Sequence, residues 1–304
     1  MEKIHIIGAG ISGLIAATVL EKNGFHPVII EATDRPGGRI KTDIVDGYQL
    51  DHGFQVLLTA YPAAQKYLDF DSLDLQVLLP GASIFKNNKQ KIIGDPLNNI
   101  SLLFPTLFSG IGNFSDKLKI LKLNNRLKKK SLVSIFSSKE QSTLSYLIDL
   151  GFSNQIITDF FNPFFTGIFL EPHLDTSSRM FEFVYKMFGA GSAAIPKAGI
   201  EAIPKQLFQN LSNTTFKFNT KVAAIGDGQI TLEDKTKFKS LCTIDATNLL
   251  SHSKNHSTKW KSCHVLYFET ENKIIRKKLI GLVPEKETII NNIFYHTSLE
   301  TAEI

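Results

Sequence analysis

Apolar and polar residues are arranged in short blocks at the start of the chain, and these blocks predict a strand, a helix and a second strand. Ile4–Ile7 is a short, mainly apolar run ended by a glycine, which is typical of a buried strand in a parallel sheet. Apolar residues then recur at helical spacing over about Ile11–Asn23, and Gly24 marks the helix end. Val28–Ile30 is a second buried run. The order predicts a βαβ unit.

The loop between the first strand and the helix contains three glycines at the spacing G-x-G-x-x-G. Its residues are Gly8, Ala9, Gly10, Ile11, Ser12 and Gly13. In this context the first glycine permits a tight turn, the second lets the backbone approach a pyrophosphate, and the third lets the helix pack close to the strand. The helix amino terminus adds unsatisfied N–H groups that favour an anion. An ordinary glycine-rich turn without a ligand is the alternative, and the agreement of strand, spacing and helix favours a dinucleotide site.

The second strand ends in an acidic residue, Glu31, which Ala32 follows. A carboxylate at this point of a βαβ unit accepts hydrogen bonds from an adenosine ribose and repels a 2′-phosphate. A second glycine element follows at once, in residues 35–39, which read Arg-Pro-Gly-Gly-Arg. Gly38 lets the backbone come near a ligand, and Arg39 supplies a planar fork of donors to a pyrophosphate. A plain NAD-binding domain does not need this element, so we expect FAD, with a NAD-dependent dehydrogenase as the alternative.

These motifs, together with Asp51–Gln55, resemble the superfamily of FAD-dependent amine oxidases and phytoene desaturases, which also contains protoporphyrinogen oxidases. The resemblance implies that Glu31 holds the adenosine ribose and that the Gly-Gly-Arg element lies along the FAD pyrophosphate. It places Gly53, Phe54 and Gln55 near the flavin ring, and it makes the backbone of Val222 the adenine contact. Residues 195–200 resemble a further superfamily segment, in which Ala198 stands where a glycine is usual.

The resemblance also implies an α/β fold, in which a Rossmann-like FAD-binding domain, with a parallel sheet and a β-meander, is interleaved with an α+β substrate domain. We expect the FAD-binding domain in residues 1–60 and 189–250, and the substrate domain in residues 61–188 and 251–304. Short strands separated by turn residues are predicted at Thr215–Phe218, Val222–Ile225, Gln229–Leu232, Lys237–Phe238 and Leu241–Ile244. A helix starting at Pro62, a hairpin turning at residues 86–89, and later strands at Trp260–Phe268, Lys278–Val283 and Ile289–His296 complete the prediction.

The middle of the chain has two interpretations. Pro96–Ser115 carries no charge, but its prolines, glycines and asparagines argue against a lipid-exposed spanning helix. Asp116–Lys130 is a predicted helix, capped by Ser115, whose charges after Asp116 are all basic. Residues 96–130 could therefore form a peripheral membrane contact. The alternative, which we favour, is a helix of the substrate domain that packs its leucines inward and leaves a solvated basic face.

Phenylalanines are concentrated between Phe160 and Phe169, where they line either an apolar substrate channel or a plain core. The resemblance favours the channel and a small, apolar substrate.

Gly189–Ala194 imitates a dinucleotide loop but lacks a preceding strand, so we expect a connecting loop. No spacing identifies a catalytic residue: His52 and Tyr185 are candidates by type alone, and a structural role is expected for His52.

Composition narrows the remaining choices. The chain has 304 residues, 43% of them apolar and 21% charged, which predicts a folded protein of more than one domain. Its net charge of +5 comes without any nucleic-acid-binding motif. Two cysteines and eight scattered histidines predict neither a disulfide framework nor a metal site, and a reduced, cytoplasmic setting is the default. The pattern does not set the oligomeric state.

Members of the superfamily continue beyond the point matching Ile304, to a Gly-Asp element and a second glycine-rich helix start near the flavin. This sequence lacks such a segment. Two functions therefore remain. The first is an FAD-dependent oxidoreductase that abstracts a hydride from an amine or from an apolar polyene or ring. The second is a truncated, inactive nucleotide-binding or interaction module.

Overall fold

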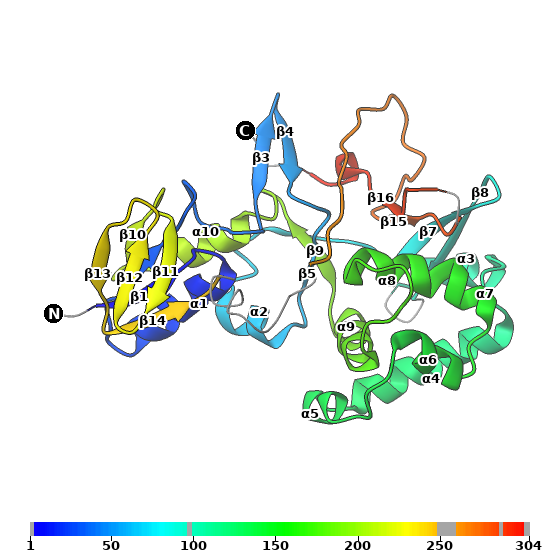
Figure 1. Cartoon of the computed structure of the whole chain (residues 1–304). Helices are drawn as coiled ribbons and strands as arrows, with labels where there is room; N and C mark the ends of the chain where they lie inside the picture. The colour runs from blue at the N-terminus through cyan, green and yellow to red at the C-terminus, as the bar shows by residue number, and fades with distance from the viewer. Residues whose placement is uncertain (1–2, 96–98, 248–259, 286–287, 301–304) are drawn as a thin grey trace.

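The computed structural model of the chain describes residues 3–95, 99–247, 260–285 and 288–300. Strands from the amino terminus and from residues 215–245 gather at one end of the molecule, and the helices of residues 103–190 gather at the other (Figure 1). Both helices and sheets contribute, and one sheet is entirely parallel, which confirms the predicted α/β class.

The parallel sheet has the strand order β10-β2-β1-β14. Its strands are β1 (Ile4–Ile7), β2 (Val28–Ile30), β10 (Thr215–Lys217) and β14 (Cys242–Asp245). The order corresponds to 3-2-1-4 along the chain, as in one half of a dinucleotide-binding sheet. Helix α1 (Ile11–Lys22) ends one residue earlier than predicted, with Asn23 as its cap, and Gly24 takes the expected positive φ of 81°.

Each face of this sheet is covered by a different layer. Leu14 and Ala17 of α1 pack with Ile6, Ile29 and Leu207 on one face, Leu207 coming from α10 (Ala202–Gln209). On the other face, Ile7, Val28 and Ile30 pack against Val222 and Ile230. The latter two belong to an antiparallel meander of β11 (Val222–Gly226), β12 (Gln229–Leu232) and β13 (Lys237–Lys239). The meander predicted from the sequence is therefore present.

A second, mixed sheet has the order β16-β15-β7-β8 and lies beside the helices. Its strands are β7 (Gly81–Lys86), β8 (Lys89–Gly94), β15 (Ile280–Leu282) and β16 (Asn292–Ile293). The helices are η1 (Ile100–Leu102), α3 (Leu103–Phe108), α4 (Phe114–Lys129), α5 (Leu132–Phe136), α6 (Thr143–Asp149), α7 (Asn154–Ile156), η2 (Ile157–Phe161), α8 (Asn162–Phe169) and α9 (Ser178–Ala190). The turn between β7 and β8 falls at Asn87 and Asn88, as predicted.

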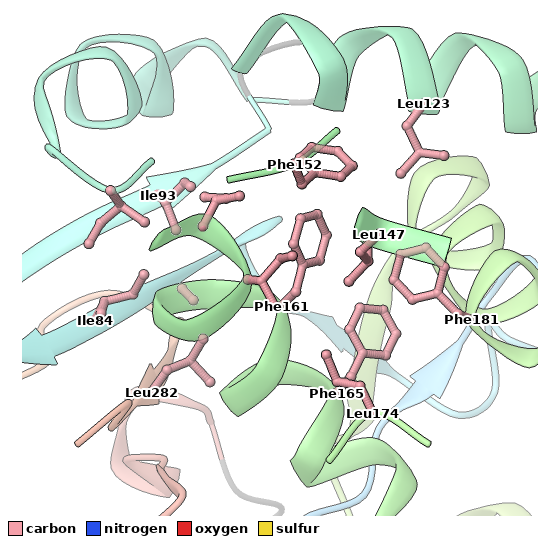
Figure 2. Packing of buried hydrophobic residues seen from close by; sticks show 14 of the residues in the cluster. Ile84, Ile93, Leu123, Leu147, Phe152, Phe161, Phe165, Leu174, Phe181 and Leu282 are labelled. Atoms are coloured by element: carbon pink, nitrogen blue, oxygen red, sulfur yellow. The ribbon is translucent and has the colours of Figure 1, made fainter. Parts of the chain in front are cut away.

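The phenylalanine-rich segment packs into the core of this second region. Phe161 and Phe165 are fully buried, and the Phe165 ring lies 4.7 Å from that of Phe181 on α9. Figure 2 shows Phe152, Phe161, Phe165 and Phe181 converging with Leu147 and Leu174. The rings of Phe161 and Phe165 therefore belong to the core, as the second interpretation of this segment has it, whereas Phe160, Phe164 and Phe169 are partly buried.

Several shorter elements lie between the two regions (Figure 1). Strand β9 (Ala193–Pro196) pairs antiparallel with β5 (Leu57–Leu58) and β6 (Leu75–Val77), and α2 (Pro62–Tyr67) begins at Pro62 as predicted. Residues 189–194 are therefore the end of α9 and the start of β9, and only part of them is the predicted loop. A hairpin of β3 (Thr42–Val45) and β4 (Tyr48–Asp51) projects from the molecule (Figure 1).

The structure corrects three local predictions. Trp260–Phe268 is exposed and forms no strand, since it pairs with none of the sheets formed by the described residues. Residues 289–296 contribute only β16 and the start of η4 (His296–Ser298). The cap of α4 is Asn113, not Ser115: the Asn113 side chain accepts from the Asp116 N–H, and the Asp116 carboxylate accepts from the Asn113 N–H. Within the described residues, no helix combines the length and apolarity needed to cross a bilayer.

Candidate functional site

The glycine loop exposes the amino terminus of α1. Gly8 has a φ of 98° and donates its N–H to the Ile30 carbonyl at 2.8 Å, which turns the chain out of the sheet. A Cβ on Gly13 would lie 1.9 Å from the Gly8 oxygen, so only glycine permits this packing of helix on loop. Gly10 caps α1 without a side-chain acceptor. First-turn N–H groups that lack such an acceptor can bind an anion.

The second glycine element lies directly against the first. Gly37 donates its N–H to the Ala9 carbonyl at 3.0 Å and forms a parallel bridge with Gly10. A Cβ on Gly38 would meet the Gly10 Cα at 3.2 Å, and Gly38 has a φ of 61°. The two glycine motifs thus form one backbone surface with almost no side chains, as close approach of a pyrophosphate requires.

The carboxylate of Glu31 lies beside this surface and is 7% exposed. Its Oε2 accepts the Ala9 N–H at 2.7 Å, and its Oε1 accepts the N–H and the hydroxyl of Thr33, each at 2.9 Å. A carboxylate offers about four acceptor positions, so one remains for a further donor such as a ribose hydroxyl. Glu31 therefore fixes the glycine loop through Ala9, in addition to its predicted role as an acceptor for the ribose. The next residue, Ala32, is exposed.

The two arginines of residues 35–39 have different surroundings. Arg35 donates to Glu201 through Nε at 3.0 Å and to Asp43 through Nη2 at 2.6 Å. Arg39 is exposed, and its guanidinium makes no hydrogen bond or ion pair with the described residues. Arg35 therefore links the second glycine element to Glu201 and to Asp43 of β3, whereas Arg39 can reach a ligand.

Residues 52–55 lie next to Arg39. The Gln55 amide donates to the carbonyls of Arg39, at 3.2 Å, and His52, at 2.9 Å. Gly53 has a φ of 92°, which turns the chain back. The Phe54 ring lies 4.7 Å from that of Phe294. Gly53, Phe54 and Gln55 thus continue the surface that begins at the glycine loop.

Val222 lies near Glu31, at the start of β11. Its side chain is buried against β2, and the neighbouring Thr220 N–H donates to the Glu31 carbonyl at 2.9 Å. The ladder with β12 changes register between Val222 and Ala224. Such a bulge leaves backbone groups of the strand outside the ladder, where they can contact a base.

A cavity of about 390 Å³ opens next to Gly53, between the β3–β4 hairpin and residues 263–267. Its lining combines the apolar side chains of Val45, Leu50 and Val265 with the polar groups of Asp43, Asp51, His52, Cys263 and Tyr267. His52 Nε2 lies 2.6 Å from Asp43 Oδ2, and hydrogen bonds from His52 and then Arg35 hold the pKa of Asp43 below its usual value. The Tyr267 hydroxyl donates to the Asp51 carbonyl at 2.7 Å, and burial raises its pKa to about 12.

Sequence reasoning missed Tyr267 and His296 as neighbours of residues 51–54. The rings of Tyr267 and His296 lie 5.6 Å apart, and burial lowers the pKa of His296, which favours its neutral form. Both residues come from segments far along the chain and follow no motif spacing, so no sequence signal marks them. Tyr185 instead stacks on Phe181 at 5.4 Å and belongs to the core. Among the described residues, no cluster of His, Cys, Asp and Glu could hold a metal ion.

The hydrogen-bond donors and acceptors of this site are of the types that a dinucleotide requires. They comprise uncapped amides at a helix amino terminus, a glycine surface, an uncommitted arginine and a buried carboxylate at the end of β2. Anionic and hydroxyl groups of a ligand match these donors and acceptors. The cavity at Gly53 continues from the same surface and is large enough for a small organic molecule.

Known proteins are similar to this chain in sequence and in fold. A family model described as flavin containing amine oxidoreductase matches residues 11–300. Protoporphyrinogen oxidase 2 of Arabidopsis thaliana is 25% identical over 55% of this chain and 32% of its own length. An L-amino-acid oxidase of Sistrurus catenatus edwardsii is 28% identical over 49% of this chain and 28% of its own length. The chain thus spans about a third of these curated relatives.

Solved structures agree at the level of the fold. An oxidoreductase from Methanosarcina mazei superposes with a TM-score of 0.61, at 23% identity, over 83% of this chain and 62% of that one. A putrescine oxidase superposes with a TM-score of 0.57, at 19% identity, over 82% of this chain and 59% of that one. Because the family model covers almost the whole sequence, the chain belongs to the flavin-containing amine oxidoreductase family.

Proposed function

We propose that this chain binds FAD and acts as an oxidoreductase that abstracts a hydride from an amine or from an apolar polyene or ring. One observation carries the proposal: the Gly37–Gly38 backbone packs on the exposed amino terminus of α1, with the Glu31 carboxylate beside it. A plain NAD-binding unit needs only the first glycine loop and the carboxylate. The second glycine element and Arg39 extend the surface toward Gly53, as a longer dinucleotide requires.

Each predicted residue has a role in this proposal. The backbone of residues 8–13 and Gly38 bind the pyrophosphate, and Arg39 donates to its oxygens. Glu31 accepts from the ribose through its remaining acceptor position, beside the exposed backbone of Ala32. The backbone at Val222 contacts the adenine, and Gly53, Phe54 and Gln55 border the flavin ring.

When bound, the flavin supplies the hydride acceptor, so the protein needs to orient the substrate and exclude water. The cavity beside Gly53 can hold a small molecule against the flavin side of the surface. Val45, Leu50 and Val265 supply an apolar lining, which supports a small, apolar substrate. The His52–Asp43 pair and the Tyr267 hydroxyl can orient a polar group, such as an amine nitrogen.

A spectroscopic titration of the purified chain with FAD and with NAD tests cofactor binding. We expect tight binding of FAD, and weakened FAD binding in Glu31→Ala and Arg39→Ala. Phe25→Ser is a matched surface control, because Phe25 lies after α1 and outside the proposed site. If the chain binds neither nucleotide, the interaction-module alternative replaces the proposal, and preferential NAD binding supports a dehydrogenase.

Anaerobic mixing of the FAD-loaded chain with panels of amines and of apolar polyenes tests the reaction. Loss of oxidised-flavin absorbance with one panel identifies the substrate class. A chain that binds FAD tightly but is reduced by neither panel, while dithionite reduces it normally, would refute the proposed hydride abstraction and leave the binding site intact.

A further inference from the structure

Helices α3 and α4 meet at a corner where large apolar side chains are exposed. Phe108 at the end of α3 is 81% exposed, and Phe114 at the start of α4 is 69% exposed. The two helix ends are neighbours, because Lys117 Nζ donates to the Leu107 carbonyl at 2.7 Å. Leu107, Leu118 and Leu121 are also exposed on these helices. We call this surface, residues 107–122, the α3–α4 corner.

Helix α4 separates its apolar residues onto two opposite faces. Leu123 and Leu127 are buried against the core. Phe114, Leu118 and Leu121 recur at helical spacing on the outward face, where burial against the rest of the protein cannot account for them. The capping box between Asn113 and Asp116 fixes the start of the helix and thereby the direction of this outward face.

Basic side chains border the apolar surface on both sides. Lys122 and Lys129 are exposed on α4, and neither side chain forms a hydrogen bond or ion pair with the described residues. The one acid of that helix, Asp116, is fully buried. Across the turn after α3, Lys89 and Lys91 line a cavity of about 290 Å³ together with Gly110 and Gln155. Lys86 lines the same cavity, but Asp159 at 2.7 Å neutralises it. On α4 and around this cavity, the carboxylates of Asp116 and Asp159 are buried or paired, so the free charge there is positive.

We propose that the α3–α4 corner binds the surface of an anionic lipid bilayer. The exposed rings of Phe108 and Phe114 enter the boundary between headgroups and acyl chains, and the bordering lysines contact lipid phosphates. A bilayer is favoured over a protein partner because the unburied charges on α4, around the exposed apolar residues, are all basic. The proposal is independent of FAD binding, since no residue of the nucleotide surface takes part.

Vesicle co-sedimentation of the full chain tests this proposal. The probes are vesicles of phosphatidylcholine alone and vesicles that also contain phosphatidylglycerol. We expect clearly tighter binding to the anionic vesicles, which added salt weakens. The pair Lys122→Ala and Lys129→Ala should reduce that binding by about fivefold for each lysine. The pair Phe108→Ser and Phe114→Ser should reduce it by about tenfold or more.

Phe268→Ser is the matched control, because Phe268 is 80% exposed but lies far from the corner in sequence and outside α3 and α4. We expect this variant to bind vesicles as the original chain does. Equal binding to both kinds of vesicle, or unchanged binding of the double phenylalanine variant, would overturn the proposal. Concentration-dependent self-association that the double phenylalanine variant abolishes, without vesicle binding, would instead assign the corner to contact between two copies.

Discussion

The two arginines of residues 35–39 provide a sharp test of the site, because replacing each one by alanine should have a different effect. Arg35 bonds to Glu201, whose side chain is 1% exposed, at 3.0 Å. It also bonds to Asp43, which is about half exposed. Arg39 has no such partner among the described residues. We expect Arg35→Ala to lower the stability of the chain without FAD, and Arg39→Ala to lower FAD affinity at unchanged stability.

The size of the first effect follows from burial. Removing one partner of a fully buried ion pair costs about 3–5 kcal/mol, because the other charge stays buried and uncompensated. The Arg35 side chain is 34% exposed, so water partly screens the pair. The Thr42 N–H still donates to Glu201 at 2.9 Å after the change. We therefore expect a loss of about 2–3 kcal/mol from the Glu201 contact.

Urea unfolding of the chain without FAD, followed by circular dichroism, measures this loss. Glu201→Gln combined with Arg35→Ala is the internal control, because it removes the buried charge that Arg35→Ala leaves with only the half-exposed Lys205, at 3.7 Å, as a neighbouring cation. The double variant should be more stable than Arg35→Ala. The reasoning fails if Arg35→Ala unfolds like the original chain, or if its FAD affinity falls while its stability does not change.

Three further predictions concern the fold. Burial raises the pKa of Asp116, but hydrogen bonds from Ser153 and the Asn113 N–H outweigh it and leave the pKa below its usual value. The Asp116 carboxylate therefore contributes fully to the free energy of unfolding above its unfolded pKa of about 4, and this contribution is lost as the pH falls through the lower folded pKa. Urea unfolding of Asp116→Asn should lack this pH dependence. Phe161→Ala should cost about 3–5 kcal/mol in the same assay, whereas Val133→Ser, at a position 78% exposed, should cost less than about 0.5. Gly13→Ala should lower the melting temperature strongly, because its Cβ meets the Gly8 oxygen at 1.9 Å, whereas Gly189→Ala has open space and should not.

The parallel sheet and the glycine loop were predictable because local rules determine them. The strands Ile4–Ile7 and Val28–Ile30 have the predicted bounds, since each is an apolar run limited by glycine or by a polar residue. The meander was predictable for the same reason, because its turns carry Asp-Gly and Glu-Asp signals. Each of these elements depends on neighbours in sequence.

The errors occur where distant contacts decide the structure. Trp260–Phe268 has apolar residues typical of a strand, but a strand also needs a partner edge, and sequence does not specify one. Asn113, and not Ser115, caps α4, because the side chains of Asn113 and Asp116 each accept a hydrogen bond from the backbone N–H of the other residue. The role of Arg35 could not be read from its motif, since its partner Glu201 lies 166 residues away.

The same buried network explains how the nucleotide surface and the cavity are held in one arrangement. Glu201 binds Arg35 of the second glycine element and accepts from the Thr42 N–H of β3. The Thr42 hydroxyl donates to Asp51 at 2.6 Å, and the Asp51 carbonyl accepts from Tyr267, which lines the cavity. Because these polar groups are mostly buried, each must keep its partner. Loss of Glu201 should therefore disturb the cavity as well as the glycine surface, although Glu201 lines neither the cavity nor the glycine surface.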